Sequence, residues 1–161
     1  MATLLLKKSY LIKDLKEIKF KDLWNDYGVF TTMRVMGKDK KILFFKEHIE
    51  NLIRSLKIYG LNKTNLKKNI LKIIKNSLSK NTNYNHLLRV AINKKMISIS
   101  LRKRNKPKLN FKLKLLNYKR IDPSHKNLKY KKILSYLKKL DNTEYDIVLH
   151  KNKKFLETGT S

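Results

Sequence analysis

The chain has 161 residues, which is enough for one domain or for one domain and part of another. Its hydrophobic fraction of 41% excludes a disordered tail, and the absence of cysteine excludes a disulfide framework and a cysteine metal site. The formal net charge of +28 is extreme, but 34 of the 40 basic residues are lysines spread along the chain. We interpret this charge as compositional bias, because a nucleic-acid site usually carries more arginine.

The N-terminal part of the sequence predicts a β-hairpin. Residues 1–23 are weakly periodic and predict a strand or a short helix. The run 27–36 is rich in β-branched and aromatic residues, which favour a strand. Residues 37–40 predict a turn, and residues 41–45 predict a second strand that pairs with the first.

Two helices are predicted next. In residues 46–59, apolar side chains recur at helical spacing, as at Ile49 and Leu52, and Gly60 is a suitable C-terminal stop. A second apolar stripe predicts a helix over residues 64–79. No apolar run reaches the ~18 residues of a membrane span, so we expect no membrane partner, and the lack of cysteine fits a cytoplasmic protein.

Three further strands are predicted over residues 86–92, 96–102 and 109–115, the last two from clean alternation of apolar and polar residues. The expected fold class is therefore α+β, with an antiparallel sheet and helices on one side, in an N-terminal domain of residues 1–116. Residues 117–128, with Pro123 in their middle, predict a linker or active-site loop.

The remaining residues 129–161 predict a helix over 130–140, a strand over 146–149 and a possible partner strand over 155–157. These elements are too few to bury a core of their own. We therefore expect the incomplete start of a second, mixed α/β domain.

Three sequence blocks support a resemblance to a known family. They are Gly-Val-Phe-Thr-Thr-Met-Arg-Val at 28–35, Phe-Lys-Glu-His-Ile-Glu-Asn-Leu-Ile-Arg-Ser at 45–55, and His-Lys-Asn-Leu-Lys-Tyr at 125–130 followed by Leu-Glu-Thr-Gly-Thr-Ser at 156–161. In this order and spacing, over roughly residues 24–161, the chain resembles the fold-type IV (class IV) pyridoxal-phosphate enzymes. That family includes aminotransferases and aminodeoxychorismate lyases.

The resemblance implies a pyridoxal 5'-phosphate cofactor and a set of residues that bind it. Lys126 matches the family's catalytic Schiff-base lysine, which also shuttles the substrate α-proton. Glu157 matches the carboxylate beside the pyridine nitrogen. The small residues Thr158, Gly159 and Thr160 fit a turn whose backbone N–H groups approach the cofactor.

Other positions depart from the family pattern or match it less closely. The phosphate-binding arginine, three residues after His48, is replaced by Asn51, which supplies no charge. Arg54 lies one helical turn further and is the candidate to compensate. For the substrate, the expected residues are Arg89 on an inner strand, as the carboxylate partner, and Phe30, with Arg34 as a weaker candidate.

Three functions remain open at this point. The first is an aminotransferase that moves an amino group between an amino acid and a 2-oxo acid, which the Thr-Gly-Thr-Ser run at 158–161 favours. The second is an aminodeoxychorismate lyase, which the Phe-Thr-Thr run at 30–32 favours. The third is a small basic nucleic-acid-binding module using residues 102–104 and 118–120, although a nucleic-acid partner is the least expected. The family also implies a homodimer, no metal, and a chain that continues past Ser161, so this piece is not expected to be active alone.

Overall fold

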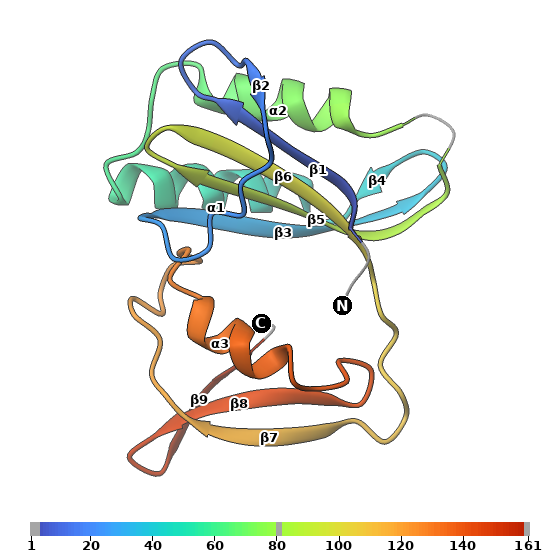
Figure 1. Ribbon diagram of the computed structural model, residues 1–161, viewed down its shortest axis with the longest axis vertical. Helices are drawn as coiled ribbons and strands as arrows, with labels where there is room; N and C mark the ends of the chain where they lie inside the picture. The colour runs from blue at the N-terminus through green and yellow to red at the C-terminus, as the bar shows by residue number, and fades with distance from the viewer. Residues whose placement is uncertain (1–3, 80–81, 160–161) are drawn as a thin grey trace. The chain divides into compact units, whose positions relative to one another are not determined.

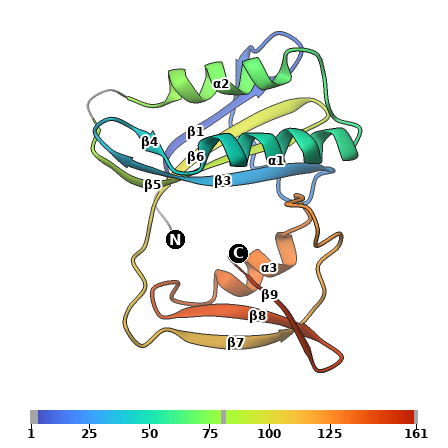
Figure 2. The same cartoon turned by 180° about the vertical axis from the view of Figure 1, so that it is seen from behind.

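The computed structural model describes residues 4–79 and 82–159, and they form two compact units. The large unit comprises Ala2–Arg104 together with His125–Leu128, and the small unit comprises Asn105–Ser124 and Lys129–Ser161. Figures 1 and 2 show the elements of each unit from opposite sides. The predicted boundaries at residues 116 and 128 separate domains that would fold independently. These domain boundaries stay a prediction.

The large unit contains one six-stranded antiparallel sheet. Its strands lie in the order β2-β1-β6-β5-β3-β4. Their bounds are β1 Leu4–Leu11, β2 Glu17–Ile18, β3 Gly28–Gly37, β4 Lys41–Ile42, β5 Tyr84–Asn93 and β6 Met96–Lys103. The long central strands β3 and β5 pair over their whole lengths, from Gly28 opposite Asn93 to Gly37 opposite Tyr84.

Two amphipathic helices, α1 (Phe45–Ile58) and α2 (Leu66–Ser77), connect β4 to β5. Helix α1 ends as predicted: Gly60 has a left-handed φ of 64°, and its N–H donates to the Lys57 carbonyl. Each helix buries one stripe of apolar residues at helical spacing. The prediction of two helices beside an antiparallel sheet is confirmed.

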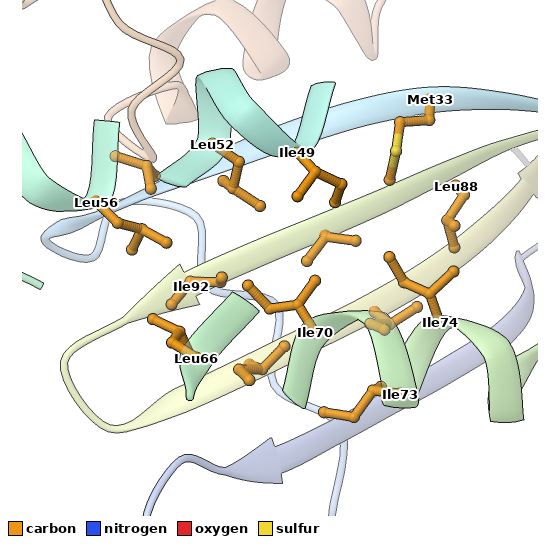
Figure 3. Close-up of a cluster of buried hydrophobic side chains, with 14 of the residues drawn as sticks. Met33, Ile49, Leu52, Leu56, Leu66, Ile70, Ile73, Ile74, Leu88 and Ile92 are labelled. Carbon is orange, nitrogen blue, oxygen red and sulfur yellow. The ribbon is translucent and has the colours of Figure 1, made fainter. Parts of the chain in front are cut away.

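The hydrophobic core lies between this pair of helices and one face of the sheet. Ile49, Leu52 and Leu56 of α1 point toward the strands, and the apolar stripe of α2 does the same (Figure 3). Side chains of β3 and β5, including Met33 and Leu88, are completely buried beneath them. Because this cluster is continuous from strand to helix, the large unit has a complete core of its own.

The opposite face of the sheet carries a second, smaller apolar cluster. Leu23, Ala91 and Leu128 are buried there, with Trp24 and Phe30 packed against them. Phe30 and Ala91 are cross-strand partners, so both project from the face that α1 and α2 leave uncovered. This cluster anchors residues from distant parts of the sequence beside the N-terminal end of β3.

The small unit has a three-stranded sheet and one short helix. Strand β7 (Lys112–Asn117) is parallel to β8 (Tyr145–Lys151), and β8 forms an antiparallel hairpin with β9 (Lys154–Thr158). Helix α3 (Lys131–Leu137) lies between β7 and β8 in sequence and contacts β8. Ile133, Leu137, Ile147 and Leu149 are its main buried aliphatic residues.

Three predictions about the strands need correction or refinement. The strand expected at 109–115 exists as β7, but it belongs to the second sheet and not to the antiparallel sheet of the large unit. The strand expected at 41–45 ends at Ile42, because Phe44 adopts a left-handed φ of 50° and α1 begins at the next residue. Within the weakly periodic residues 1–23, the structure forms β1 and β2.

Candidate functional site

Lys126 belongs to a short segment, His125–Leu128, that pairs with the first residues of β3. The Phe30 N–H donates to the Lys126 carbonyl over 2.7 Å, and the Leu128 N–H donates to the Gly28 carbonyl over 2.9 Å. An antiparallel bridge joins Val29 to Asn127 between these two bonds. The backbone of Lys126 is thus fixed to the large unit, while its side chain is exposed.

Gly28 is the residue that allows this close pairing. A Cβ atom at this position would lie 2.2 Å from the Ile92 carbonyl oxygen and 2.7 Å from the Leu128 Cδ1 atom. Both distances are far below van der Waals contact, so any larger residue would push the segment away from β3.

Thr31 and His48 form a polar pair beside this segment. The Thr31 hydroxyl and His48 Nδ1 are 3.0 Å apart and hydrogen-bonded, which connects β3 to α1. Burial, and next the positive charge of Lys126, lower the pKa of His48, while Glu47 opposes the shift. A neutral imidazole with Lys126 close by is therefore the state that the large unit favours.

Asn51 and Arg54 follow His48 on α1, and both are exposed. Asn51 lies three residues after His48, where i and i+3 side chains are neighbours on the helix surface. Its amide can donate hydrogen bonds to an anion but adds no charge. Arg54 stands one further turn along the helix, toward its C-terminal end.

Two arginines lie on the face of the large sheet opposite α1 and α2. The Arg89 Nη2 atom donates to Asp22 Oδ1 over 2.5 Å, and its guanidinium lies over the Trp24 ring at 4.3 Å. Trp24 in turn contacts the Phe30 ring edge-on at 4.9 Å. Arg34 donates to the Asn85 side chain from the same face.

The Nε atoms of Arg34 and Arg89 are buried, and neither has a hydrogen-bond partner among the described residues. Each of these guanidinium groups therefore keeps one buried N–H that no described protein acceptor satisfies. Such donors suit a carboxylate, since a guanidinium fork can bind both of its oxygens.

In the small unit, Glu157 on β9 is paired with the buried Arg120. The Arg120 Nε atom donates to Glu157 Oε1 at 2.9 Å, and Nη2 donates to Oε2 at 3.0 Å. The side chains are only 5% and 18% exposed, so this is a largely desolvated ion pair. Arg120 Nη2 also donates to the Pro123 carbonyl at 2.6 Å.

Tyr130 and Asp146 complete the buried polar cluster around this pair. The Arg120 guanidinium lies 5.3 Å from the centre of the Tyr130 ring. Burial raises the pKa of Tyr130, with further contributions from the Glu157 and Asp146 carboxylates, and Arg120 opposes them. Tyr130 is therefore a neutral hydroxyl around pH 7.

The turn after Glu157 is tightly packed. Thr158 is half-buried at the end of β9, and the Gly159 N–H donates to the Ile147 carbonyl at 2.8 Å. A Cβ at Gly159 would lie 2.4 Å from Ile147 Cγ1, so only glycine fits there. Thr160, also expected in this turn, lies outside the described residues.

The structure brings some of the predicted site residues together. The Phe30 backbone N–H donates to the Lys126 carbonyl. The Arg89 guanidinium lies over the Trp24 ring, and Trp24 and Phe30 belong to one apolar cluster. Lys126 lies in the large unit and Glu157 in the small unit. Within the described part of the chain there is no group of three or more His, Asp or Glu side chains that could hold a metal ion, and no helix there is long and apolar enough to cross a membrane.

Sequence reasoning missed three partners, namely Asp22 of Arg89, Thr31 of His48 and Arg120 of Glu157. One signal in the sequence could have indicated the ion pairs of Arg89 and Arg120. Arginine occupies only six of the 40 basic positions, and two of these six form ion pairs in which the arginine side chain itself is largely buried.

The comparisons with known proteins agree with one another. Residues 28–161 match the family described as amino-transferase class IV. The fold is similar to a branched-chain aminotransferase from Thermoproteus uzoniensis solved with norvaline (TM-score 0.67, 17% identity, covering 94% of this chain and 62% of that one). It is also similar to a hypothetical aminotransferase from Mycobacterium tuberculosis in its PLP-bound form (TM-score 0.60, 13% identity, covering 96% of this chain and 66% of that one).

A third similar structure is assigned as a 4-amino-4-deoxychorismate lyase from Legionella pneumophila (TM-score 0.57, 18% identity, covering 83% of this chain and 56% of that one). At these identities the structural likeness establishes the fold alone. The chain spans less than two thirds of the length of each of these relatives. Among proteins with curated descriptions, none matches the sequence.

Proposed function

The chain belongs to the class IV aminotransferase family, and from this premise we propose that the whole protein transfers an amino group between an amino acid and a 2-oxo acid, with pyridoxal 5'-phosphate as cofactor. The observation that carries the proposal is the anchoring of Lys126 on β3, beside Phe30 and the Thr31–His48 pair, within a match that covers residues 28–161.

The residues of this chain fit the cofactor in two of three respects. Lys126 offers an exposed primary amine on a fixed backbone, and Glu157 offers a charge-paired carboxylate for a pyridine nitrogen. The phosphate position is weaker, because Asn51 provides only neutral donors and Arg54 is displaced by a helical turn. The turn after Glu157 adds little, because the Gly159 N–H already donates to the Ile147 carbonyl.

When bound, pyridoxal phosphate supplies an electron sink for the bond that breaks at the substrate α-carbon. The chain's own task is then to hold and move a proton. The Lys126 amine takes the α-proton in its neutral form and returns it later. Burial lowers the pKa of His48, so the ring that hydrogen-bonds to Thr31 adds no charge beside this amine.

The arginine face supports the assignment of a substrate carboxylate site. Arg89 is our primary candidate and Arg34 the secondary one, since both lie on the same face of β3 and β5 as Phe30. Phe30 would contact the substrate side chain from the apolar cluster below. Asp22 already binds Arg89, so it would share or give up this guanidinium when a carboxylate arrives.

Aminodeoxychorismate lyase is the second candidate. Thr31 stands where many aminotransferases of the family carry glutamate, and its hydroxyl is committed to His48. A lyase needs the same lysine and cofactor but releases pyruvate in place of a new amino acid. In either case we propose a homodimer in the cytoplasm, on the family pattern and on the absence of cysteine.

The proposal is tested by reducing the full-length, cofactor-loaded protein with borohydride and mapping the labelled peptide. We expect a single adduct on Lys126 and loss of essentially all turnover in Lys126→Ala. Lys129→Ala, an equally charged neighbour, is the matched control and should keep both adduct and activity. Label scattered over many lysines, or unchanged turnover in Lys126→Ala, would refute the site. Measuring pyruvate release from aminodeoxychorismate against amino-acid formation separates the two candidate reactions.

A further inference from the structure

We infer that Arg120 is the positioning residue for the Glu157 carboxylate and, through it, for the ring nitrogen of the bound cofactor. The inference rests on the proposed function, which places Glu157 beside that nitrogen. Its basis is the geometry of the ion pair within the small unit, where both residues lie.

The two side chains meet in a parallel, bidentate arrangement. Two different nitrogens of one guanidinium donate to the two different oxygens of one carboxylate, at 2.9 and 3.0 Å. This fork fixes the plane of the carboxylate as well as its distance, whereas a single hydrogen bond would leave the carboxylate free to rotate. Glu157 therefore has a defined direction in which its remaining lone pairs point.

Arg120 is itself held from two further sides. Its Nη2 atom donates to the Pro123 carbonyl at 2.6 Å, and its guanidinium lies over the Tyr130 ring at 5.3 Å. With a side chain that is 5% exposed, it has little freedom to move with solvent. The orientation of Glu157 is consequently set by a rigid support and not by a flexible surface side chain.

Lysine could not perform this role. Its ammonium group is a point charge on a flexible stem and offers no planar fork. The chain uses lysine at 34 of its 40 basic positions, so an arginine in this buried position is a departure from its own composition. The geometry supplies a physical reason for that departure.

The paired carboxylate can still accept a proton donor. Each carboxylate oxygen has two lone pairs, and the guanidinium engages one on each. A pyridine N–H can therefore hydrogen-bond to Glu157 while Arg120 stays in place. Arg120 touches neither substrate nor cofactor in this arrangement and acts only through Glu157.

The test compares pyridoxal phosphate with its 1-deaza analogue, in which a C–H group replaces the ring nitrogen. Dissociation constants of both are measured by absorbance and fluorescence titration for the full-length protein and for Arg120→Gln, Arg120→Lys and Glu157→Gln. Lys119→Gln, an exposed neighbour, is the control for loss of one positive charge. The ratio of the two dissociation constants isolates the contribution of the ring nitrogen.

We expect the unmodified protein to prefer pyridoxal phosphate over the deaza analogue, and Arg120→Gln to reduce this preference about tenfold. Glu157→Gln should reduce this preference to a similar extent, and Lys119→Gln should leave it unchanged. The preference of Arg120→Lys should lie between those of Arg120→Gln and the unmodified protein. If Arg120→Gln does not fold, Arg120→Lys decides the matter, since it retains the charge and removes only the fork.

Equal weakening of both ligands by the Arg120 variants would overturn the inference, because a purely structural role affects them alike. An unmodified protein that binds neither ligand, or forms no borohydride adduct on Lys126, would overturn the proposed function as well. The two failures are thus distinguishable: in the first the cofactor still reacts with Lys126, and in the second it does not.

Discussion

The two units of this chain hold their candidate functional residues by different means. In the large unit a continuous core of buried aliphatic side chains joins α1, α2 and the sheet, and Lys126 is attached to that structure by backbone hydrogen bonds. In the small unit, large apolar residues such as Leu109, Leu113, Leu115 and Phe155 are exposed. Glu157 is held there mainly by a buried ion pair.

This difference means that Lys126 and Glu157 should respond differently to mutation of their surroundings. A backbone attachment to a complete core fails only when the core or the sheet edge is disturbed. A carboxylate held by a guanidinium depends on one partner, whose removal leaves a desolvated charge behind. The predictions below test this comparison, beginning with the largest expected effect.

The core of the large unit should respond most strongly to truncation. Leu88 is fully buried between β5 and the helices, so Leu88→Ala should lower the free energy of unfolding by about 2–5 kcal/mol. Urea unfolding followed by circular dichroism measures this change. A loss below about 1 kcal/mol would mean that the core of the large unit is not continuous as described.

Gly28→Ala should have the next largest effect, about 1–3 kcal/mol of destabilisation, because the new methyl group overlaps the Ile92 carbonyl and Leu128. The expected signature is local: amide hydrogen exchange at Phe30 and Leu128 should accelerate more than exchange in α2. Gly60→Ala, at a left-handed position with no atom within 4 Å of the added Cβ, is the control without overlap. Equal acceleration at residues 28–30 in both variants would contradict this explanation.

His48 should make the large unit more stable at pH 7 than at pH 5. Its folded-state pKa is lowered from 6.5, so the unfolded chain binds more protons below that pH, and the free energy of unfolding decreases as the pH falls toward the folded-state pKa. His48→Gln should reduce the difference in stability between pH 7 and pH 5. Urea titrations at both values measure it, with His150→Gln in the small unit as the control. An unchanged difference in His48→Gln would argue against a half-buried, neutral His48.

Leu115→Ser should produce the smallest change in stability, within about ±0.5 kcal/mol, because the Leu115 side chain is 62% exposed. If the substitution instead destabilises the protein as much as Leu88→Ala, this face of the small sheet is covered in solution. The contrast between the two units would then have to be abandoned. Thermal unfolding of both variants side by side gives the answer.

Local patterns in the sequence were sufficient for most of the fold. The helical spacing of Ile49, Leu52 and Leu56 and the β-branched run of β3 specify these elements without their partners. Strand β7 shows the limit. Its alternation of leucine and lysine predicts a strand with one buried side, but Leu113 and Leu115 are exposed. Its partner β8 follows an intervening helix, and periodicity does not encode such long-range pairing.

The site was predictable only as far as motif matching extends. Lys126 and Glu157 were identified from their neighbours in sequence, and those assignments stay a prediction. Their physical partners lie far away in the chain: Arg120 is 37 residues from Glu157, and Asp22 is 67 residues from Arg89. Ion pairs of this kind form only after the chain has folded, so nothing local in the sequence marks them beyond the choice of arginine over lysine.

The pairing of His125–Leu128 with β3 also has a consequence for the order of folding. Gly28 and Leu128 are about a hundred residues apart, so this contact has a high loop-closure cost and should form late. During synthesis the sheet and both helices can assemble before Lys126 has left the ribosome. The segment that carries Lys126 would then be added to a scaffold that is already complete, and a nascent chain interrupted before residue 125 would carry that scaffold without the segment.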